Sequence, residues 1–209
     1  MIKVFFMIFE PGIAWEKIAL ARRGQLYILT TYLLPYVLLI TLLEGWGLEK
    51  WGKWQSKFQK FRDFTHHEVI GYEAIQFVLL LAMVYIAGLL ILRVSQTFHG
   101  RNTYLQAFTL AAYGFSPVFL WRLLDPIPTM NPWVTWGMGV AMMIWILYQG
   151  VPRVIQPDPT HAFGLYLSTI FVMVLTSGMV RLVTAMFLTG QSSFNHSWLT
   201  RELSHFLSH

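Results

Sequence analysis

The sequence predicts an all-α, polytopic membrane protein: a bundle of five transmembrane helices with an amphipathic interfacial helix between the first and the second. Of the 209 residues, 56% are hydrophobic and only 12% are charged, whereas soluble domains carry about 25% charged residues. Nine Trp residues and a 16% aromatic content are typical of chains that meet membrane–water interfaces. The length suits a single membrane domain over 1–209, with an N-terminal interfacial segment (1–25), the bundle (26–188) and a C-terminal tail (189–209).

Five segments carry the roughly 20 mostly apolar residues that a spanning helix needs. They are residues 26–43, 74–92, 104–124, 132–150 and 162–188. Pro35 in the first segment and Ser116-Pro117 in the third predict kinks, because proline removes a backbone donor from a helix.

Two Asx-Pro pairs predict where the last two helices begin. In Asn131-Pro132 and in Asp158-Pro159, the first residue suits the N-cap and the proline suits the first helical position. Three prolines between residues 150 and 159 predict a stiff connection between these helices.

The polar stretch 49–64 predicts a helix that lies flat in the headgroup region. Aromatic residues recur at helical spacing, with a lysine one residue before each, so a helix would carry two adjacent stripes. These residues are Lys50, Trp51, Lys53, Trp54, Lys57, Phe58, Lys60 and Phe61. An amphipathic helix packed on the bundle is the alternative. A second interfacial helix is expected over 197–209.

Composition and motifs exclude several function classes. The chain has no cysteine, so it has no disulfide framework and no thiolate nucleophile. It contains no recognisable catalytic or phosphate-loop motif, so we expect no enzymatic activity and no cofactor. The net charge of +5 comes from basic residues that flank apolar runs, which favours anionic lipid headgroups over nucleic acid as the partner.

Residues 103–117 and 145–150 resemble one family. The first stretch combines Gln106-Ala107, Tyr113 and the Ser116-Pro117 kink, and the second is Trp-Ile-Leu-Tyr-Gln-Gly. In these motifs, and in its layout over 5–190, the chain resembles the Ypt-interacting-protein (Yip) domain family of five-span membrane proteins. The resemblance implies a cytoplasmic N-terminus and an outside or lumenal C-terminus, an orientation that the nearly balanced Lys and Arg counts on the two sides do not decide.

Eukaryotic members of that family sit in Golgi and endoplasmic-reticulum membranes, bind prenylated Rab-type GTPases, and influence vesicle traffic and membrane shape. They carry a long N-terminal region with an Asp-Leu-Tyr-Gly-Pro-like motif, whereas here the nearest match is Phe9-Glu-Pro-Gly12. This difference argues against Rab binding. The short N-terminal segment resembles bacterial members, which implies a multi-pass protein of a bacterial inner (plasma) membrane.

The helix order brings the N-terminal segment and the loops after the second and fourth helices to one face. That face holds Glu10, Glu16, Arg22, Arg23, His99, Arg101, Arg153, Asp158 and His161. One hypothesis is a divalent-metal site of His99, Asp158 and His161 with Glu10, since imidazole and carboxylate suit zinc. The alternative is that Asp158, His161 and His99 serve as ordinary helix caps.

A second hypothesis for the same face is a binding site for lipid phosphate. Arg22, Arg23, Arg101 and Arg153 would form it, because guanidinium groups bind phosphate in a bidentate manner. Ordinary anchoring of helix ends is the alternative.

Several polar residues fall inside the predicted spans, where interhelical hydrogen bonds are the default expectation. They are Tyr104, Gln106, Tyr113, Ser116, Gln149 and Arg181. We expect Arg181 to snorkel or to face Glu44 or Glu73, and Arg122 to pair locally with Asp125.

The sequence therefore favours a non-enzymatic protein of membrane organisation that binds lipids or membrane partners, as a homo-oligomer or with another membrane protein. The alternative is a channel or transporter for a small solute or divalent metal. A closed bundle in which Gln106, Tyr113 and Gln149 satisfy one another would favour the first. A continuous polar path would favour the second.

Overall fold

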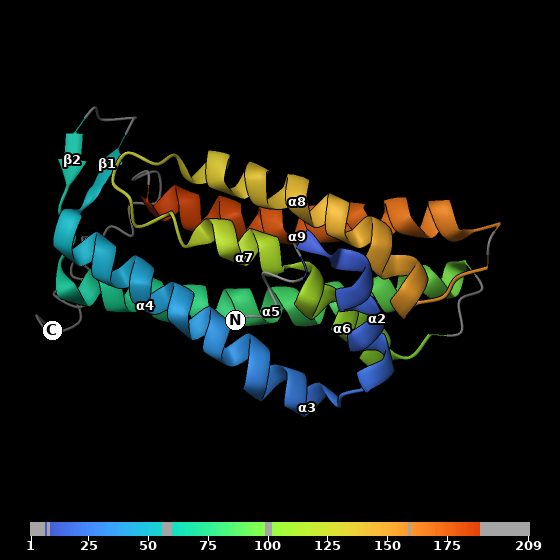
Figure 1. Ribbon diagram of the computed structural model, residues 1–209. Helices are drawn as coiled ribbons and strands as arrows, with labels where there is room; N and C mark the ends of the chain where they lie inside the picture. Colours follow the sequence, from blue (N-terminus) through green and yellow to red (C-terminus); the bar gives the residue numbers. More distant parts are fainter. Residues whose placement is uncertain (1–6, 8, 56–59, 99–101, 159, 189–209) are drawn as a thin grey trace, which may run out of the picture.

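The computed structural model describes residues 7, 9–55, 60–98, 102–158 and 160–188, which form an elongated helical bundle (Figure 1). In chain order its elements are α2 (Pro11–Ala21), α3 (Gln25–Ile28), the π-helix η1 (Leu29–Leu33), α4 (Leu34–Trp51), β1 (Lys53–Gln55), β2 (Lys60–Arg62), α5 (His66–Thr97), α6 (Tyr104–Gly114), α7 (Ser116–Arg122), α8 (Pro132–Val154) and α9 (Ala162–Leu188). The predicted interfacial helix in the C-terminal tail lies outside the described residues.

Four of the five predicted spans are confirmed by length and hydropathy. Residues 25–51, 66–97, 132–154 and 162–188 each form helix long and apolar enough to cross a membrane. The third predicted span is helical as well, but it consists of two shorter consecutive helices, α6 and α7. They run along the bundle one after the other (Figure 1).

The break between α6 and α7 occurs at the predicted proline. Pro117 has no N–H for the carbonyl of Tyr113, four residues earlier. The Ser116 hydroxyl donates to that carbonyl instead, so the lost backbone bond is replaced within the core. Ser116 also contacts the Tyr32 hydroxyl, and Tyr36 donates to the Ser116 carbonyl at 3.3 Å.

Pro35 is accommodated differently. It follows the π-helix η1, in which the Leu34 N–H reaches back five residues to the Leu29 carbonyl. The hydroxyl of Thr30 donates to the Leu26 carbonyl at 2.9 Å, and that of Thr31 to the Tyr27 carbonyl. The predicted distortion is therefore a widened turn, and its two threonine side chains satisfy carbonyls of the preceding turn, α3.

One of the two predicted helix starts is confirmed. The Asn131 side chain accepts the Trp133 N–H at 2.9 Å, which makes Asn131 the N-cap of α8 with Pro132 at N1. The prediction of Asp158 as the N-cap of the last helix is wrong, because α9 begins at Ala162, which is the first residue of the predicted fifth span. Part of the expected stiff connection is also helical, since α8 includes Pro152 and continues to Val154.

The predicted interfacial helix over 49–64 is wrong. Helix α4 ends at Trp51, because Gly52 has φ 64° and turns the chain away. An antiparallel pair of strands follows, with Lys53 opposite Arg62 and Gln55 opposite Lys60.

The eight residues assigned to that helix are thus divided. Lys50 and Trp51 end α4, where the Lys50 ammonium lies 4.8 Å from the Trp46 ring. Lys53 and Trp54 lie in β1, and Lys60 and Phe61 in β2. Lys57 and Phe58 lie outside the described residues.

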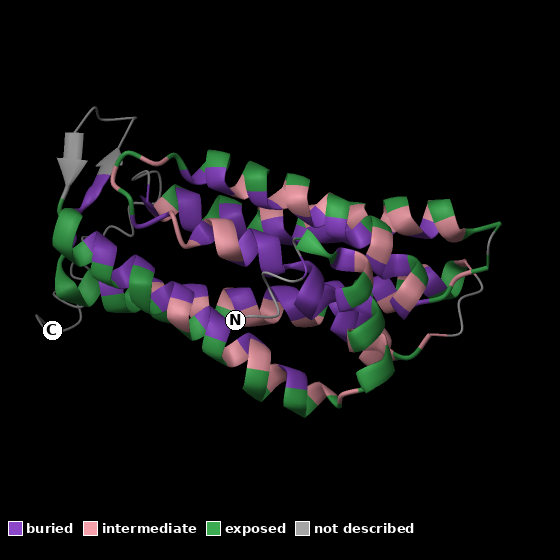
Figure 2. Ribbon diagram, in the orientation of Figure 1, coloured by how far each residue is buried: buried purple, intermediate pink, exposed green. Residues whose placement is uncertain are grey.

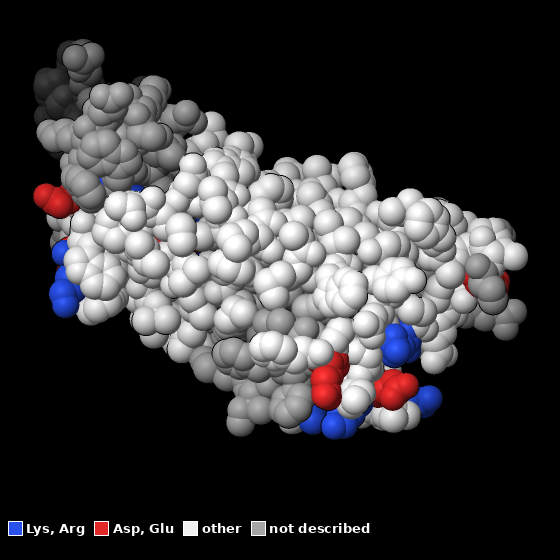
Figure 3. Space-filling model, turned by 45° about the horizontal axis from the view of Figure 1, so that its top comes forward, with Lys and Arg blue, Asp and Glu red and all other residues white. Residues whose placement is uncertain are grey.

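Helix α6 is enclosed by the neighbouring helices, and all its residues from Ala107 to Gly114 are buried (Figure 2). It packs closely on α5, where a Cβ on Gly88 would lie 3.2 Å from the Phe108 backbone. In the face shown in Figure 3, the charged side chains of the described residues gather towards the two ends of the bundle, with a broad band between that carries almost none. This distribution suits a bundle whose middle lies in hydrocarbon.

A glycine pair in α8 tests the packing of α7 on α8. A Cβ on Gly139 would lie 2.8 Å from the Val118 backbone, whereas one on Gly137 would meet nothing within 4 Å. We expect Gly139→Leu to destabilise the protein by about 1–3 kcal/mol through overpacking and Gly137→Leu to leave stability nearly unchanged. Thermal unfolding in mild detergent measures both, and equal melting temperatures would contradict the described contact.

Candidate functional site

Helix α2 is fastened to the end of α8 by Trp15. This side chain is fully buried, and its indole N–H donates to the Ile146 carbonyl at 3.1 Å. The ring lies where α8 has Gly150, since a Cβ there would come within 2.6 Å of it. Burial of an aromatic ring together with a satisfied N–H makes Trp15 the anchor of α2.

The two sequence-adjacent arginines follow directly after α2. Arg22 ends the helix in the left-handed conformation, with φ 39°, which turns the chain towards α3. Arg23 is half-buried, and its guanidinium lies 4.7 Å from the centre of the Tyr27 ring. It also lies beside the hydroxyl of Tyr113 on α6.

These arginines and Arg153 come together in one cleft. We call it the basic cleft: a cavity of about 360 Å³ that Arg22, Arg23 and Arg153 line together with polar side chains of the α6 start and the α8 end. Its other lining residues are Ile18, Ala19, Thr103, Leu105, Gln106, Thr109, Val154 and Gln156. Three of the four predicted phosphate ligands are therefore brought together. Arg101 lies outside the described residues.

The three cations of the basic cleft have no carboxylate partner in the part of the chain that the structure describes. Arg153 donates one N–H to the Gln149 carbonyl at 2.9 Å, which leaves further donors on its five-donor guanidinium. The arrangement therefore presents three positive charges with open hydrogen-bonding capacity to one cavity.

A second cavity adjoins the basic cleft beneath α2. It measures about 350 Å³ and shares the lining residues Ile18, Arg23 and Thr109 with the cleft. The remaining lining residues are Glu10, Ile13, Ala14, Lys17, Ala21, Ile28 and Tyr113. We call it the apolar cavity, because hydrocarbon makes up most of its exposed lining surface, although the charged residues Glu10, Lys17 and Arg23 also line it.

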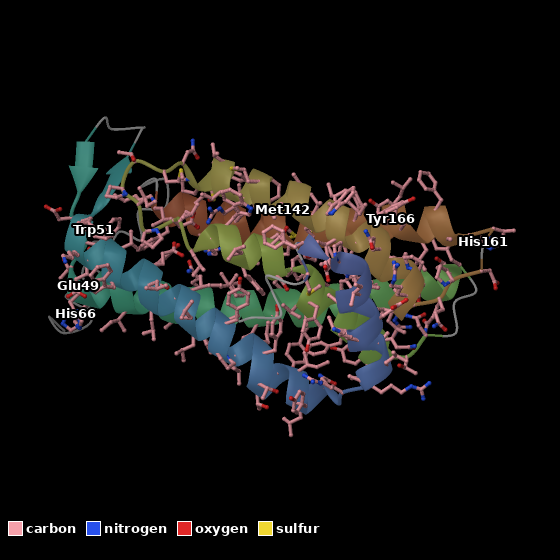
Figure 4. All side chains as sticks on the ribbon, in the orientation of Figure 1. Glu49, Trp51, His66, Met142, His161 and Tyr166 are labelled. Atoms are coloured by element: carbon pink, nitrogen blue, oxygen red, sulfur yellow. The ribbon has the colours of Figure 1, made fainter. Side chains whose placement is uncertain are left out.

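The metal hypothesis receives no support from the described residues. Among them, no three His, Asp or Glu side chains come together as metal ligands, so Glu10, Asp158 and His161 do not form a site by themselves. His161 lies at the extreme end of the bundle (Figure 4). Its backbone N–H donates to the Asp158 carbonyl at 2.9 Å. His99 lies outside the described residues.

Gln106, Tyr113 and Gln149 do not satisfy one another, so the contact that would have favoured the membrane-organising alternative over a channel is not made. Gln106 completes a capping box, in which its side chain accepts the Thr103 N–H at 2.8 Å. The Gln149 side chain lies against Gly12 of α2, with its Oε1 2.7 Å from the site of a Cβ. Tyr113 faces Tyr32, with ring centres 4.4 Å apart.

Tyr104, another of the predicted intramembrane polar residues, lies in the first turn of α6, half-buried beside Phe108.

Arg181 faces the interior of the bundle, which confirms that alternative over snorkelling. Its partner, however, is neither Glu44 nor Glu73. Its guanidinium makes a bidentate pair with Asp125, at 2.6 and 2.8 Å. It also donates to the Pro132 carbonyl at 2.8 Å and to the Thr135 hydroxyl at 2.6 Å. Arg181, only 2% exposed, and Asp125, 1% exposed, are both buried.

Arg122 has two acidic partners. The predicted local pair with Asp125 is confirmed, at 3.9 Å, and Glu44, which was not predicted, lies closer, at 3.4 Å. Arg122 also donates to the Gln76 side chain at 2.6 Å, and Gln76 in turn donates to Glu44 at 2.7 Å. Tyr72 donates to the second Glu44 oxygen at 3.0 Å.

These side chains join the pair of Arg181 and Asp125 in one buried network, which we call the ionic cluster. Its members are Glu44, Tyr72, Gln76, Arg122, Asp125, Thr135 and Arg181. They come from α4, α5, α7, the α7–α8 turn, α8 and α9.

Lys53, in strand β1 of the hairpin, lies at the same end of the bundle as the ionic cluster. Its ammonium donates to the carbonyls of Asp125 and of Ile127, the latter at 3.0 Å. Burial lowers the pKa of the Lys53 ammonium, an effect that the nearby carboxylates of Asp125 and Glu44 oppose. The sequence prediction had placed this lysine in the headgroup region.

The two ends of the bundle therefore differ. The ionic cluster consists of charges that satisfy one another. The basic cleft holds charges that, among the described residues, have no acidic partner. Sequence reasoning missed Trp15, whose role depends on a distant glycine, and Thr103 and Gln156, which line the cleft.

Comparison with known proteins identifies one family. A family model, the Yip1 domain, matches residues 5–182. No curated protein and no solved structure matches the chain significantly.

The ionic cluster generates a stability prediction. We expect Asp125→Ala to cost about 3–5 kcal/mol, because it leaves the Arg181 guanidinium buried without its partner. The double variant Asp125→Ala with Arg181→Met should regain part of that loss.

Thermal unfolding of the two variants in detergent measures these effects. The control is Glu49→Ala, which removes an exposed pair with His66 worth less than about 1 kcal/mol. A double variant less stable than Asp125→Ala alone would contradict the uncompensated-charge explanation.

The anchor of α2 generates a second prediction. Trp15→Ala removes a fully buried ring, at a cost of about 3–5 kcal/mol to the docking of α2. We expect trypsin to cut faster after Lys17 and Arg22, with the spanning helices still protected, as followed by mass spectrometry. Trp46→Ala, at a site 52% exposed, is the matched control, and equal cleavage rates in the two variants would refute the anchor.

Proposed function

The chain belongs to the Yip1 domain family, and on that premise we propose that it is a non-enzymatic, five-span membrane protein that organises lipid by binding anionic phospholipid headgroups in the basic cleft. In this proposal α6 and α7 together make the third span. The N-terminus and the cleft face the cytoplasm, and the membrane is a bacterial inner membrane.

The observation that carries the proposal is the convergence of Arg22, Arg23 and Arg153 on one cavity. The first two end α2 and the third lies near the end of α8. Guanidinium groups are suited to phosphate, because their planar donors match its oxygens and their hydration is weak. A cavity with three such groups and no acidic partner among the described residues favours a phosphate monoester or diester over a neutral ligand.

The location of the cleft supports a lipid as the source of that phosphate. The cleft lies where α2 and α8 end and α6 begins, and α8 is one of the spanning helices. Exposed aromatic side chains lie at the same end, Tyr27 at 46% and Tyr148 at 64% exposure. Such side chains favour the headgroup level, and the cytoplasmic leaflet is the one that carries anionic lipid.

Binding of this kind would hold selected lipids around each copy of the protein. A basic side chain near an anionic surface contributes about 1 kcal/mol, so three of them correspond to roughly 100-fold in affinity. The channel or transporter alternative and the oligomeric state stay predictions, and Rab-type GTPase binding is not part of the proposal.

The test is lipid selectivity of the purified protein in mild detergent, measured by native mass spectrometry with added phosphatidylglycerol or phosphatidylcholine. We expect the wild type to prefer phosphatidylglycerol. The variant Arg22→Gln/Arg23→Gln/Arg153→Gln should lose that preference by roughly 100-fold, because both lipids carry the phosphate and only the arginines distinguish a net anionic headgroup from one that also bears a choline cation.

The matched control is Lys50→Gln, which removes a cation at the opposite end of the bundle. An unchanged preference in the triple variant would contradict the proposal. Metal analysis of the same sample checks the divalent-metal hypothesis, which stoichiometric zinc would revive.

A further inference from the structure

The apolar cavity is lined on one side by small side chains of α2, and the proposed headgroup site does not explain this feature. On α2, the side chains of Ala14, Ile18 and Ala21 lie at spacings of four and three residues, and all three line it. This spacing places them on one helix face. Two of the three are alanines, so that face leaves space where a packed interface would carry larger residues.

The wall opposite that face is formed by Ile28, Thr109 and Tyr113 of α3 and α6. The Thr109 hydroxyl donates to the Leu105 carbonyl of its own helix at 2.6 Å, so its hydrogen-bonding capacity is directed into the helix. Most of the surface offered to an occupant is hydrocarbon.

Arg23 connects the two cavities, because it lines both of them. Its guanidinium also lies beside the Tyr113 hydroxyl. A ligand that spans the two cavities would therefore have its charged group at the arginines, polar contacts near Arg23 and Tyr113, and an apolar part beneath α2. That order of groups is the order found along a phospholipid.

We propose that the apolar cavity beneath α2 holds one hydrocarbon chain of the anionic phospholipid whose phosphate lies in the basic cleft. The proposal rests on the proposed function and adds a determinant to it: the protein selects for an acyl chain as well as for a headgroup. The volume of about 350 Å³ lies within the range of about 300–1,000 Å³ of small-ligand cavities. Adjacency to the cationic cleft identifies the occupant as the tail of that anionic lipid.

The position of α2 makes the cavity dependent on the Trp15 anchor. Helix α2 carries Trp15 against α8, and the adjoining part of its surface carries Ala14, Ile18 and Ala21 over the cavity. The helix thus acts as a cover attached along one side. Each lipid chain bound beneath it would add apolar contact to α2.

The experiment compares two probes that share a phosphate, glycerol 3-phosphate and a lysophosphatidic acid with a 16-carbon chain. Native mass spectrometry of the full chain gives the affinity of each, and the ratio of the two affinities measures the contribution of the hydrocarbon chain. We expect a ratio of at least about 100 in the wild type, because burial of several methylenes adds to the affinity.

Ala21→Phe fills the cavity from α2, and we expect it to lower that ratio at least about tenfold. The matched control is Leu20→Phe, at a neighbouring position of α2 that is 81% exposed and outside the cavity lining. It should leave the ratio unchanged, which separates the cavity from general partition into detergent. Equal ratios in the two variants, or no effect of chain length in the wild type, would overturn the inference.

The arginine variants separate this inference from the proposed function. If Arg22→Gln/Arg23→Gln/Arg153→Gln weakens both probes and preserves the ratio, headgroup and chain sites both stand. If glycerol 3-phosphate binding is insensitive to the arginines, the headgroup proposal fails. A ratio that still falls in Ala21→Phe would then support the chain cavity on its own.

Discussion

The bidentate pair between Arg181 and Asp125 is the interaction on which the arrangement of the bundle depends. A guanidinium in the interior of a membrane protein is costly unless its donors are satisfied, and here Asp125, Thr135 and the Pro132 carbonyl satisfy them. These partners lie between α7 and the first turns of α8, whereas Arg181 lies in α9. The requirement to pair the charge therefore determines how α9 is placed against the start of α8. Arg122 with Glu44 and Gln76 extends the same requirement to α4 and α5.

At the other end of the bundle, the basic cleft depends on arginines that are not paired with carboxylates of the described residues. Helix α2 is held there by the burial of Trp15 and its one hydrogen bond. The nearby arginines form no ion pair with the described residues, so they do not stabilise the fold in this way. Charge that is neutralised internally contributes to structure, while charge without an acidic partner remains for a ligand. The buried helix pair α6–α7 connects the two ends, and its first residues line the cleft while Arg122 at its last residue joins the ionic cluster.

Patterns with local causes could be predicted from the sequence. The apolar segments, the Asn131 cap and the interruption at Pro117 follow from hydropathy, side-chain chemistry and the missing proline donor. The common location of Arg22, Arg23 and Arg153 followed from helix order alone. The prediction of the interfacial helix was wrong because the aromatic and lysine stripes take no account of Gly52. This glycine adopts a positive φ and ends α4. The partner of Arg181 could not be predicted, because Asp125 lies 56 residues away and the rotation of each helix is decided by packing. The contact of Trp15 with Gly150 is a tertiary feature of the same kind.

In the proposals above, the basic cleft and the apolar cavity form one binding site for an anionic phospholipid. The most direct measurement is an electron cryo-microscopy structure of the protein in nanodiscs that contain phosphatidylglycerol. The account predicts phosphate density within hydrogen-bonding distance of Arg22, Arg23 and Arg153, continuous with density for a hydrocarbon chain beneath α2. A structure in which these arginines pair with carboxylates of the protein, and α2 closes on α6 without an occupant, would contradict it.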